Sequence, residues 1–179
     1  MEEILRTERL TVRKFMPADS GDLAEILTDP EVTYFEPYET FTAEACIKEA
    51  ENFSASDEFF AVVLGGKVIG KIYFSRQKYG TAEIGYTFGR AFQGKGYACE
   101  SVHAFMGYAF GKLGVRRIIA EIDTRNKRSA SLAKRLGMQI EGEHKQVFPR
   151  KEDPDKYNDL YIFAMLKSEY SQPKKGVIK

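Results

Sequence analysis

The chain is poor in the residues that build metal sites. It has two cysteines, Cys46 and Cys99, and two histidines, His103 and His144, among its 179 residues. The cysteines stand far apart and form no Cys-x-x-Cys pair, so we expect no zinc or other metal and a reduced, cytoplasmic setting. Neither histidine has a nearby partner that would predict a catalytic role.

Two further shortages exclude classes of partner. The 27 Lys and Arg residues nearly balance the 26 Asp and Glu residues, and a formal net charge of +1 attracts neither nucleic acid nor a membrane surface. No apolar run approaches the roughly 20 residues of a membrane span, and Met1-Glu2-Glu3 is unlike a signal peptide. The length predicts a single domain over residues 1–170, followed by a flexible basic tail over 171–179.

Periodicity and turn signals predict strands first and alternating strands and helices later. The expected strands are Leu10–Phe15, Phe59–Leu64, Val68–Ser75, Ala82–Phe88, Arg117–Asp123, Met138–Gln146 and Leu160–Leu166. The expected helices are Ser20–Leu27, Thr42–Asn52, a run that ends at Leu113, and Arg128–Leu136. This order predicts a mixed sheet of α/β or α+β class.

One turn carries most of the functional information. Residues Gln93–Ala98 read Gln-Gly-Lys-Gly-Tyr-Ala and lie between the strand-like run Ala82–Phe88 and a helix-like run. Main-chain N–H groups and the positive end of a helix dipole would converge there. Two glycines in three residues would also let a bulky ligand approach the main chain. The turn therefore predicts a phosphate-binding loop.

Two nucleotide-binding patterns fit this turn poorly. The dinucleotide fingerprint G-x-G-x-x-G needs a glycine where Cys99 stands. A Walker-A pattern is present over Gly89–Lys95, but Gly96 replaces the Ser or Thr whose hydroxyl would hold magnesium. The Walker-B-like run Ile118–Asp123 is interrupted by Glu121. A nucleotide hydrolase or kinase is thus the weaker interpretation, and the pyrophosphate loop of an acyl-coenzyme A binder is the stronger.

Several short motifs follow one another along the chain. They are Thr7–Arg13 (Thr-Glu-Arg-Leu-Thr-Val-Arg), Ala82–Tyr86 (Ala-Glu-Ile-Gly-Tyr), Gln93–Glu100 (Gln-Gly-Lys-Gly-Tyr-Ala-Cys-Glu), Asn126–Ser129 (Asn-Lys-Arg-Ser) and Leu136–Met138 (Leu-Gly-Met). Together they resemble the GNAT acetyltransferase superfamily, in particular the RimJ/RimL branch of ribosomal-protein N-acetyltransferases. The resemblance runs from about Glu2 to Tyr170.

The resemblance implies a fold and an activity. The fold would be a mixed central sheet of about seven strands with helices on both faces, splayed between the fourth and fifth strands. The activity would be transfer of an acetyl group from acetyl-CoA to a primary amine by direct attack in a ternary complex. A protein N-terminal α-amine is the favoured acceptor, while a small-molecule amine, an antibiotic, or a non-catalytic acyl-CoA sensor stays open. Homodimers are common in the family, although nothing in the sequence requires one.

The resemblance also implies where acetyl-CoA would lie. The pyrophosphate would sit on Gln93, Gly94, Lys95, Gly96, Tyr97 and Ala98. The pantetheine would run beside the preceding strand, where main-chain N–H groups near Thr87 and Phe88 would polarise the thioester carbonyl. The amide of Asn126 would hold the pantetheine arm, since it both donates and accepts hydrogen bonds. A helix N-cap or turn role is the alternative for Asn126.

Glu83 and Ser129 are the candidate catalytic residues. Glu83 lies on the strand that leads to the loop and is the candidate general base; the alternative is a solvent-facing charge. The resemblance implies that Ser129 gives a proton to the coenzyme A thiolate. The alternative for Ser129 is an ordinary place in the first turn of a helix. Tyr86 and Tyr97 are interpreted as core or ligand-packing aromatics rather than as acids.

Two departures from the family pattern affect these assignments. Many members carry a tyrosine in the helix that holds Ser129 and use it as the acid, but residues 129–136 contain no tyrosine. Ser129 is therefore the stronger candidate acid. The position three residues before the first loop glycine is Ala91 instead of Gln or Arg, which leaves the side-chain contact to the phosphates unassigned. A rim of cations is expected instead from Lys95, Arg90, Lys127, Arg128 and Lys134.

Two stretches are candidates for the acceptor side. Tyr34–Tyr38 (Tyr-Phe-Glu-Pro-Tyr) could line an acceptor pocket, or it could pack between helix and sheet. Phe148–Asn158 could gate that side, although its composition also suits a surface loop. Cys99 is expected to be a small buried residue, because direct acyl transfer needs no enzyme nucleophile.

Overall fold

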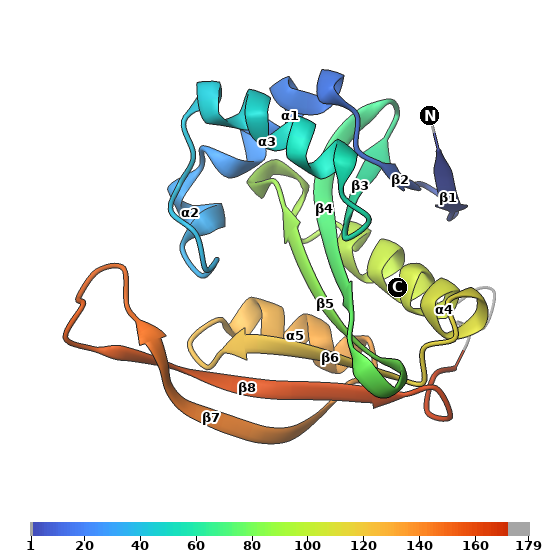
Figure 1. Cartoon of the computed structure of the whole chain (residues 1–179), viewed down its shortest axis with the longest axis vertical. Coiled ribbons are helices and arrows are strands. Elements are labelled where there is room, and N and C mark those ends of the chain that lie inside the picture. The colour runs from blue at the N-terminus through green and yellow to red at the C-terminus, as the bar shows by residue number, and fades with distance from the viewer. Residues whose placement is uncertain (1, 172–179) are drawn as a thin grey trace.

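The computed structural model describes residues 2–171 and confirms a mixed α/β fold built on one sheet (Figure 1). The strands are β1 (Glu3–Arg6), β2 (Thr11–Lys14), β3 (Phe59–Leu64), β4 (Lys67–Arg76), β5 (Thr81–Phe88), β6 (Arg117–Asp123), β7 (Gln139–Pro149) and β8 (Tyr157–Leu166). The helices are α1 (Ser20–Leu27), α2 (Pro30–Thr33), α3 (Ala43–Ala55), α4 (Tyr97–Lys112) and α5 (Lys127–Arg135), with short 3-10 turns η1 (Pro17–Asp19), η2 (Lys78–Gly80) and η3 (Arg90–Phe92). The strand order is β1-β2-β3-β4-β5-β6-β8-β7. The tail predicted over 171–179 lies, apart from its first residue, outside the described residues.

The sheet has eight strands, one more than the seven predicted. The additional strand is β1, which pairs antiparallel with β2 at the edge of the sheet. It is only four residues long and carries Glu3 and Arg6 at its ends, so it has none of the alternation that marks a strand in a sequence. The β1 strand matters because of where it lies. It begins a hairpin with β2, and the turn of that hairpin contains Thr7–Arg9.

The pairing of β5 with β6 ends early. β5 and β6 are the one parallel pair in the described sheet, and their register covers only Thr81–Glu83 against Arg117–Ile119. Beyond that point β5 stays paired with β4 as far as Phe88, and β6 stays paired with β8 as far as Asp123. The two strands therefore diverge, as Figure 1 shows, and their facing edges lose their partners. This part of the β5–β6 junction, the splay, is where the prediction put it.

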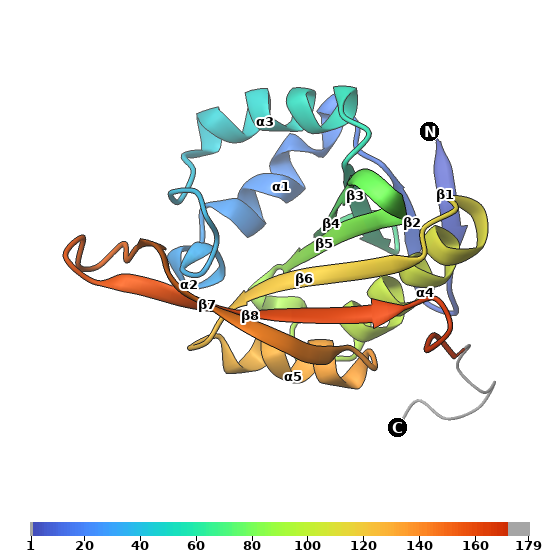
Figure 2. The same cartoon turned by 60° about the horizontal axis from the view of Figure 1, so that its bottom comes forward.

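Helices cover both faces of the sheet. Figures 1 and 2 show α1 and α3 on one side and α4 and α5 on the other. Because strand residues alternate between faces, each side has its own apolar core. Phe105 of α4 packs with Ile84 of β5 in one, and Leu23 and Phe53 of α1 and α3 pack with Val63 of β3 in the other. The face that α1 and α3 cover is called the α1–α3 face below.

Other predictions from composition can be compared directly with the structure. No helix within residues 2–171 is long and apolar enough to cross a membrane. Cys46 is buried and Cys99 is half-buried, and both are free thiols. Within the same residues there is no group of three or more His, Cys, Asp and Glu side chains that could hold a metal ion.

A buried ion pair joins β2 to the start of α1. Arg13 donates from both terminal nitrogens to the two carboxylate oxygens of Asp19, each at 2.7 Å, and the residues are 2% and 6% exposed. Asp19 also accepts the Met16 N–H at 2.8 Å. The pair fixes the angle at which the chain leaves the sheet to form the α1–α3 layer.

Replacing Asp19 should therefore be costly. Asp19→Asn leaves the buried Arg13 guanidinium without its counter-charge, and we expect the free energy of unfolding to fall by about 3–5 kcal/mol. Urea denaturation followed by circular dichroism measures this loss. Asp57→Asn is the matched control, since Asp57 pairs with Lys14 at 2.7 Å but is fully exposed, and it should change the midpoint very little. Equal losses in the two variants would contradict the role given to the buried pair.

Candidate active site

The glycine-rich turn after β5 forms a loop that opens onto the start of a long helix. Gly94 and Gly96 have φ values of +74° and +82°, in the left-handed region that side chains other than glycine rarely adopt. Gly96 is the N-cap of α4, a 16-residue helix that begins at Tyr97. Successive N–H groups of the loop and of the first helical turn are therefore free of helix bonds and lie at the positive end of the dipole. This is the geometry that binds a pyrophosphate, and Gln93–Ala98 is called the phosphate loop below.

The hairpin between β1 and β2 braces the phosphate loop. The Glu100 carboxylate, 9% exposed, accepts hydrogen bonds from the Thr7 hydroxyl at 2.5 Å and from the Arg9 main-chain N–H at 3.0 Å. The Arg9 guanidinium forms an ion pair with Glu100 at 2.6 Å and also donates to the Lys95 carbonyl at 3.2 Å. It lies over the Tyr97 ring, 4.6 Å from its centroid. Sequence reasoning used Thr7–Arg13 only as a family signature and missed this role.

The edge of β5 that faces the splay presents main-chain donors. The Gly89 N–H donates to the Ile69 carbonyl on β4 at 3.0 Å. Since consecutive strand residues point their N–H groups to opposite edges, the N–H groups of Phe88 and Tyr86 point away from β4 and into the splay. The N–H of Thr87, by the same alternation, belongs to the ladder with β4. Of the two residues expected to polarise a thioester carbonyl, Phe88 is the one whose N–H faces the splay.

The Gln93 side chain ties three parts of the site together. Its Nε2 donates to the Phe88 carbonyl at 2.9 Å, and its Oε1 accepts from Arg128 of α5 at 3.2 Å. One side chain thus links the end of β5, the phosphate loop and the start of α5. The pairing of β5 with β6 ends at Glu83 and Ile119. At the open end of the splay, here called its mouth, the Gln93 side chain therefore holds the two sides together.

Ser129 and Asn126 lie together at the start of α5. The Asn126 side chain caps the helix by accepting the Ser129 N–H at 3.1 Å, which is the structural role foreseen for it. The Ser129 hydroxyl donates to the Tyr86 hydroxyl at 3.3 Å, and that hydroxyl donates to the Ser129 carbonyl at 3.2 Å. Burial raises the pKa of Tyr86 to about 12, so its phenol stays protonated at neutral pH. Tyr86 therefore reaches from β5 to the candidate acid.

Glu83 lies where the pairing of β5 with β6 ends. It is opposite Ile119 in the last parallel pair and points to the α1–α3 face, where Gln77 donates to it at 3.4 Å. Burial raises the pKa of Glu83, and the negative charges of Glu121 and Glu58 raise it further. A raised pKa makes a carboxylate a better proton acceptor near neutral pH. The location and the pKa both suit the predicted general base.

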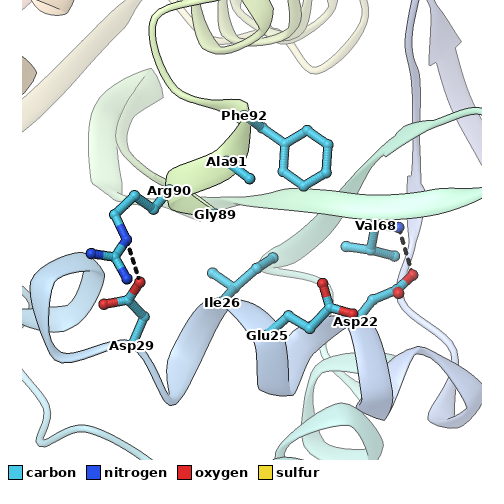
Figure 3. Close-up of a pocket in the computed structure, with 9 residues that line it drawn as sticks. All are labelled: Asp22, Glu25, Ile26, Asp29, Val68, Gly89, Arg90, Ala91 and Phe92. Atoms are coloured by element: carbon cyan, nitrogen blue, oxygen red, sulfur yellow. Dashed lines mark hydrogen bonds and ion pairs between the residues drawn. The ribbon is translucent and has the colours of Figure 1, made fainter.

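The expected cation rim is only partly available. Arg90 is held by Asp29 and Glu31, each at 3.0 Å, beside a hollow of about 200 Å³ between α1 and η3 (Figure 3). In that hollow Asp22 of α1 accepts the Val68 N–H of β4 at 2.7 Å, and Asp29, just before α2, holds Arg90 of η3. Lys127 donates to the Thr124 carbonyl at 2.7 Å, and Arg128 is bound to Gln93. Lys95 and Lys134 are exposed, and neither forms an ion pair with a residue between 2 and 171.

A polar cluster lies on the α1–α3 face beside the end of β5. The Thr87 hydroxyl donates to Glu36 at 2.8 Å, and the Lys71 ammonium lies 3.8 Å from the other oxygen of that carboxylate. Lys71 is the cross-strand neighbour of Thr87 and is 4% exposed, and burial lowers its pKa against the opposing effect of Glu36. The Tyr38 hydroxyl lies close by. Sequence reasoning named the Tyr34–Tyr38 stretch but did not single out Glu36 or Lys71.

The tip of the β7–β8 hairpin contacts α2 and the loop that follows it. Lys151 donates to the carbonyls of Thr33, at 2.8 Å, and of Tyr38. Arg125, just after β6, pairs with Asp123 at 2.9 Å and with Glu152 of the hairpin at 2.6 Å. Figure 2 shows the hairpin reaching toward α2 from the other side of the splay. The two stretches expected on the acceptor side are thus in contact, although they are far apart in the chain.

Comparison with known proteins agrees with this arrangement. The family described as "Acetyltransferase (GNAT) domain" matches residues 9–139. The N-acetyltransferase p20 of Bacillus licheniformis is 35% identical over 94% of this chain and 99% of its own length. A GNAT-family acetyltransferase structure from Bacillus anthracis covers 92% of this chain and 99% of its own, with 30% identity and a TM-score of 0.85. The ribosomal protein uS5-alanine N-acetyltransferase of Escherichia coli is 35% identical over 42% of this chain and 41% of its own length.

The brace on the phosphate loop can be tested by binding. Arg9→Gln removes the ion pair with Glu100 and the bond to the Lys95 carbonyl, so the loop has to be ordered by the ligand. We expect the affinity for coenzyme A, measured by calorimetry, to fall about tenfold because pre-organisation is lost. Arg6→Gln is the control, because Arg6 is exposed and pairs only with Glu3 of its own strand. An unchanged affinity in Arg9→Gln would show that the loop holds its shape without the hairpin.

Proposed function

This chain belongs to the GNAT acetyltransferase family and is an acetyl-CoA-dependent N-acetyltransferase, and we propose that its acceptor is the α-amine of a protein N-terminus. The observation that supports the cofactor side of the proposal is the convergence of three features on the splay. These are the phosphate loop at its mouth, the N–H groups of Tyr86 and Phe88 along one edge, and Ser129 at the start of α5. A pantetheine arm fits such an edge as an added strand would, by main-chain hydrogen bonds.

The chain's own groups can serve each part of acyl transfer. The amine attacks the thioester carbonyl, whose developing negative charge the Phe88 N–H stabilises. Glu83 takes the proton of the attacking amine through water. The sulfur leaves as a thiolate and takes a proton from the Ser129 hydroxyl, which lies beside the Tyr86 hydroxyl and regains a proton from water. Asn126 caps the helix through its oxygen, which leaves its amide nitrogen to hold the pantetheine.

The kind of amine follows from the strength of the base. At pH 7 a lysine side chain with a pKa of ~10.4 costs about 4.6 kcal/mol to neutralise, whereas an α-amine near ~7.8 costs about 1 kcal/mol. Glu83 is a single carboxylate that would act through water, which suits the less basic amine. The ribosomal-protein acetyltransferase among the relatives supports the same choice. A small-molecule amine of similar basicity is the alternative acceptor.

Ligand binding and turnover test the proposal separately. Acetyl-CoA at a hundred times its dissociation constant should stabilise the fold by about 2.7 kcal/mol in a melting experiment, and Mg-ATP should not.

Thiol release from acetyl-CoA should then appear with N-terminal peptides. Glu83→Gln and Ser129→Ala should each reduce that rate by about 10²–10⁴-fold while keeping the melting shift. Ser129→Ala retains the N–H that Asn126 caps, so α5 should stay intact. Full turnover in both variants would contradict the assigned base and acid, and stabilisation by Mg-ATP alone would contradict the cofactor.

The pH profile tests Glu83 as the base. Below its pKa the carboxyl group is protonated and cannot accept a proton, so the rate should fall on the acid side. The charge of Glu121 helps to raise that pKa. Glu121→Gln should therefore lower the pKa of Glu83 and move the acid limb of the kcat/KM profile to lower pH. Glu51→Gln, at an exposed site on α3, is the control, and an acid limb that stays in place in Glu121→Gln would exclude Glu83 as the titrating group.

A further inference from the structure

The loop between α2 and α3 carries a carboxylate that reaches β5 at the open end of the splay. Glu36 accepts the Thr87 hydroxyl at 2.8 Å, which fixes one carboxylate oxygen on the α1–α3 face of the strand. The side chain is 22% exposed, so Glu36 is only partly covered by the protein. An ionised carboxylate offers about four lone-pair sites, and Thr87 fills one of them. Glu36 is therefore held in place while most of its hydrogen-bonding capacity stays available.

One cation lies beside Glu36, as an ion pair without a hydrogen bond. The Lys71 ammonium is 3.8 Å away, beyond hydrogen-bond distance, and lies 5.2 Å from the Tyr38 ring centroid. The two other acids near the hairpin tip, Asp123 and Glu152, both have the Arg125 guanidinium as a partner. Of these three acids, Glu36 is thus the one that has no arginine partner among residues 2–171.

The Tyr38 hydroxyl is a second polar group beside Glu36. It is buried and lies close to Glu36 and Thr87, but it makes no hydrogen bond of normal geometry to any residue between 2 and 171. Burial raises its pKa, as does the nearby charge of Glu36, so the phenol remains protonated. A buried hydroxyl without a partner calls for an explanation, and a ligand with N–H groups to donate supplies one. The same ligand would meet the open side of the carboxylate.

The position of Glu36 along β5 separates it from Glu83. Glu83 lies four residues before Thr87, about 13 Å back along the strand. Thr87, by contrast, is next to Phe88, whose N–H faces the splay. Between the two carboxylates stands Gly85, against which the Tyr73 side chain of β4 packs. A group bound by Glu36 would therefore lie beside the end of β5 whose N–H is proposed to polarise the acyl carbonyl.

We propose that Glu36 is the acceptor-binding residue, whose carboxylate receives the primary ammonium of the acceptor beside Thr87 and the Tyr38 hydroxyl. This inference rests on the proposed N-acetyltransferase function and gives its acceptor side a recognition element. The ligand class is a protonated primary amine, as at a peptide N-terminus. Glu36 binds the ammonium, and the proton that the amine loses before it attacks passes to Glu83 along the water molecules that span the distance between the two carboxylates. Binding and proton removal are thus assigned to different carboxylates.

The division of roles predicts a split between KM and kcat. In Glu36→Gln the KM for a peptide acceptor should rise about 10- to 100-fold, the range of one hydrogen bond to a charged group. The kcat at saturating peptide and the melting shift with coenzyme A should stay as in the wild type. Thr87→Val keeps the shape of the side chain but removes its hydrogen bond, and it should raise KM by a smaller factor. Glu39→Gln, in the same loop but exposed, is the matched control.

A binding measurement keeps this test independent of turnover. Calorimetry would follow an alanyl tripeptide amide, with a free N-terminus, as it binds the coenzyme A complex of the wild type and of Glu36→Gln. Binding that is lost in the variant supports Glu36 even if no thiol is released, in which case only the proposed reaction fails. Equal binding and equal KM in the wild type and Glu36→Gln would overturn the inference. So would a fall in kcat at constant KM, or a wild-type complex that binds no tripeptide.

Discussion

The arrangement of this protein depends on a parallel strand pairing that ends after three residues. β5 and β6 pair only at their beginnings, because each then follows its own antiparallel partner, β4 or β8. Along the facing edges of β5 and β6, main-chain N–H groups that would form hydrogen bonds inside a continuous sheet have no strand to pair with. A strand edge of this kind binds an extended ligand through its backbone, and side chains need only set the ends of the ligand. The phosphate loop and α5 are placed at those ends.

Parts of the chain far from the splay hold these ends in position. The phosphate loop is rich in glycine and would be costly to order during binding, and the β1–β2 hairpin reduces that cost through Arg9 and Glu100. Gln93 joins the same loop to Phe88 and to Arg128, so the mouth of the splay is held from both sides. The buried Arg13–Asp19 pair fixes the start of the α1–α3 layer, next to the proposed acceptor side.

The cofactor half and the acceptor half of the site are built differently. Backbone groups and a helix N-terminus form the proposed cofactor half, and such groups suit features common to every acyl-CoA. Side chains from two loops form the proposed acceptor half, where Lys151 and Arg125 join the β7–β8 hairpin to the region around α2. A substitution in those loops can change the acceptor without disturbing the cofactor. This separation explains how one fold can serve amines of different kinds.

The sequence by itself determined the class of fold and the glycine-rich turn after β5, and its resemblance to a known family implied the place of the splay. The fold class and the turn depend on local signals, such as the alternation in Ala82–Phe88 and two glycines before a helix. Only the tertiary structure decided which side chains complete the site. Arg9 meets Glu100 across 91 residues of chain, and Thr87 meets Glu36 across 51. Such contacts leave no periodic trace in a sequence, because they arise from how helices and loops pack on the sheet rather than from how each element forms.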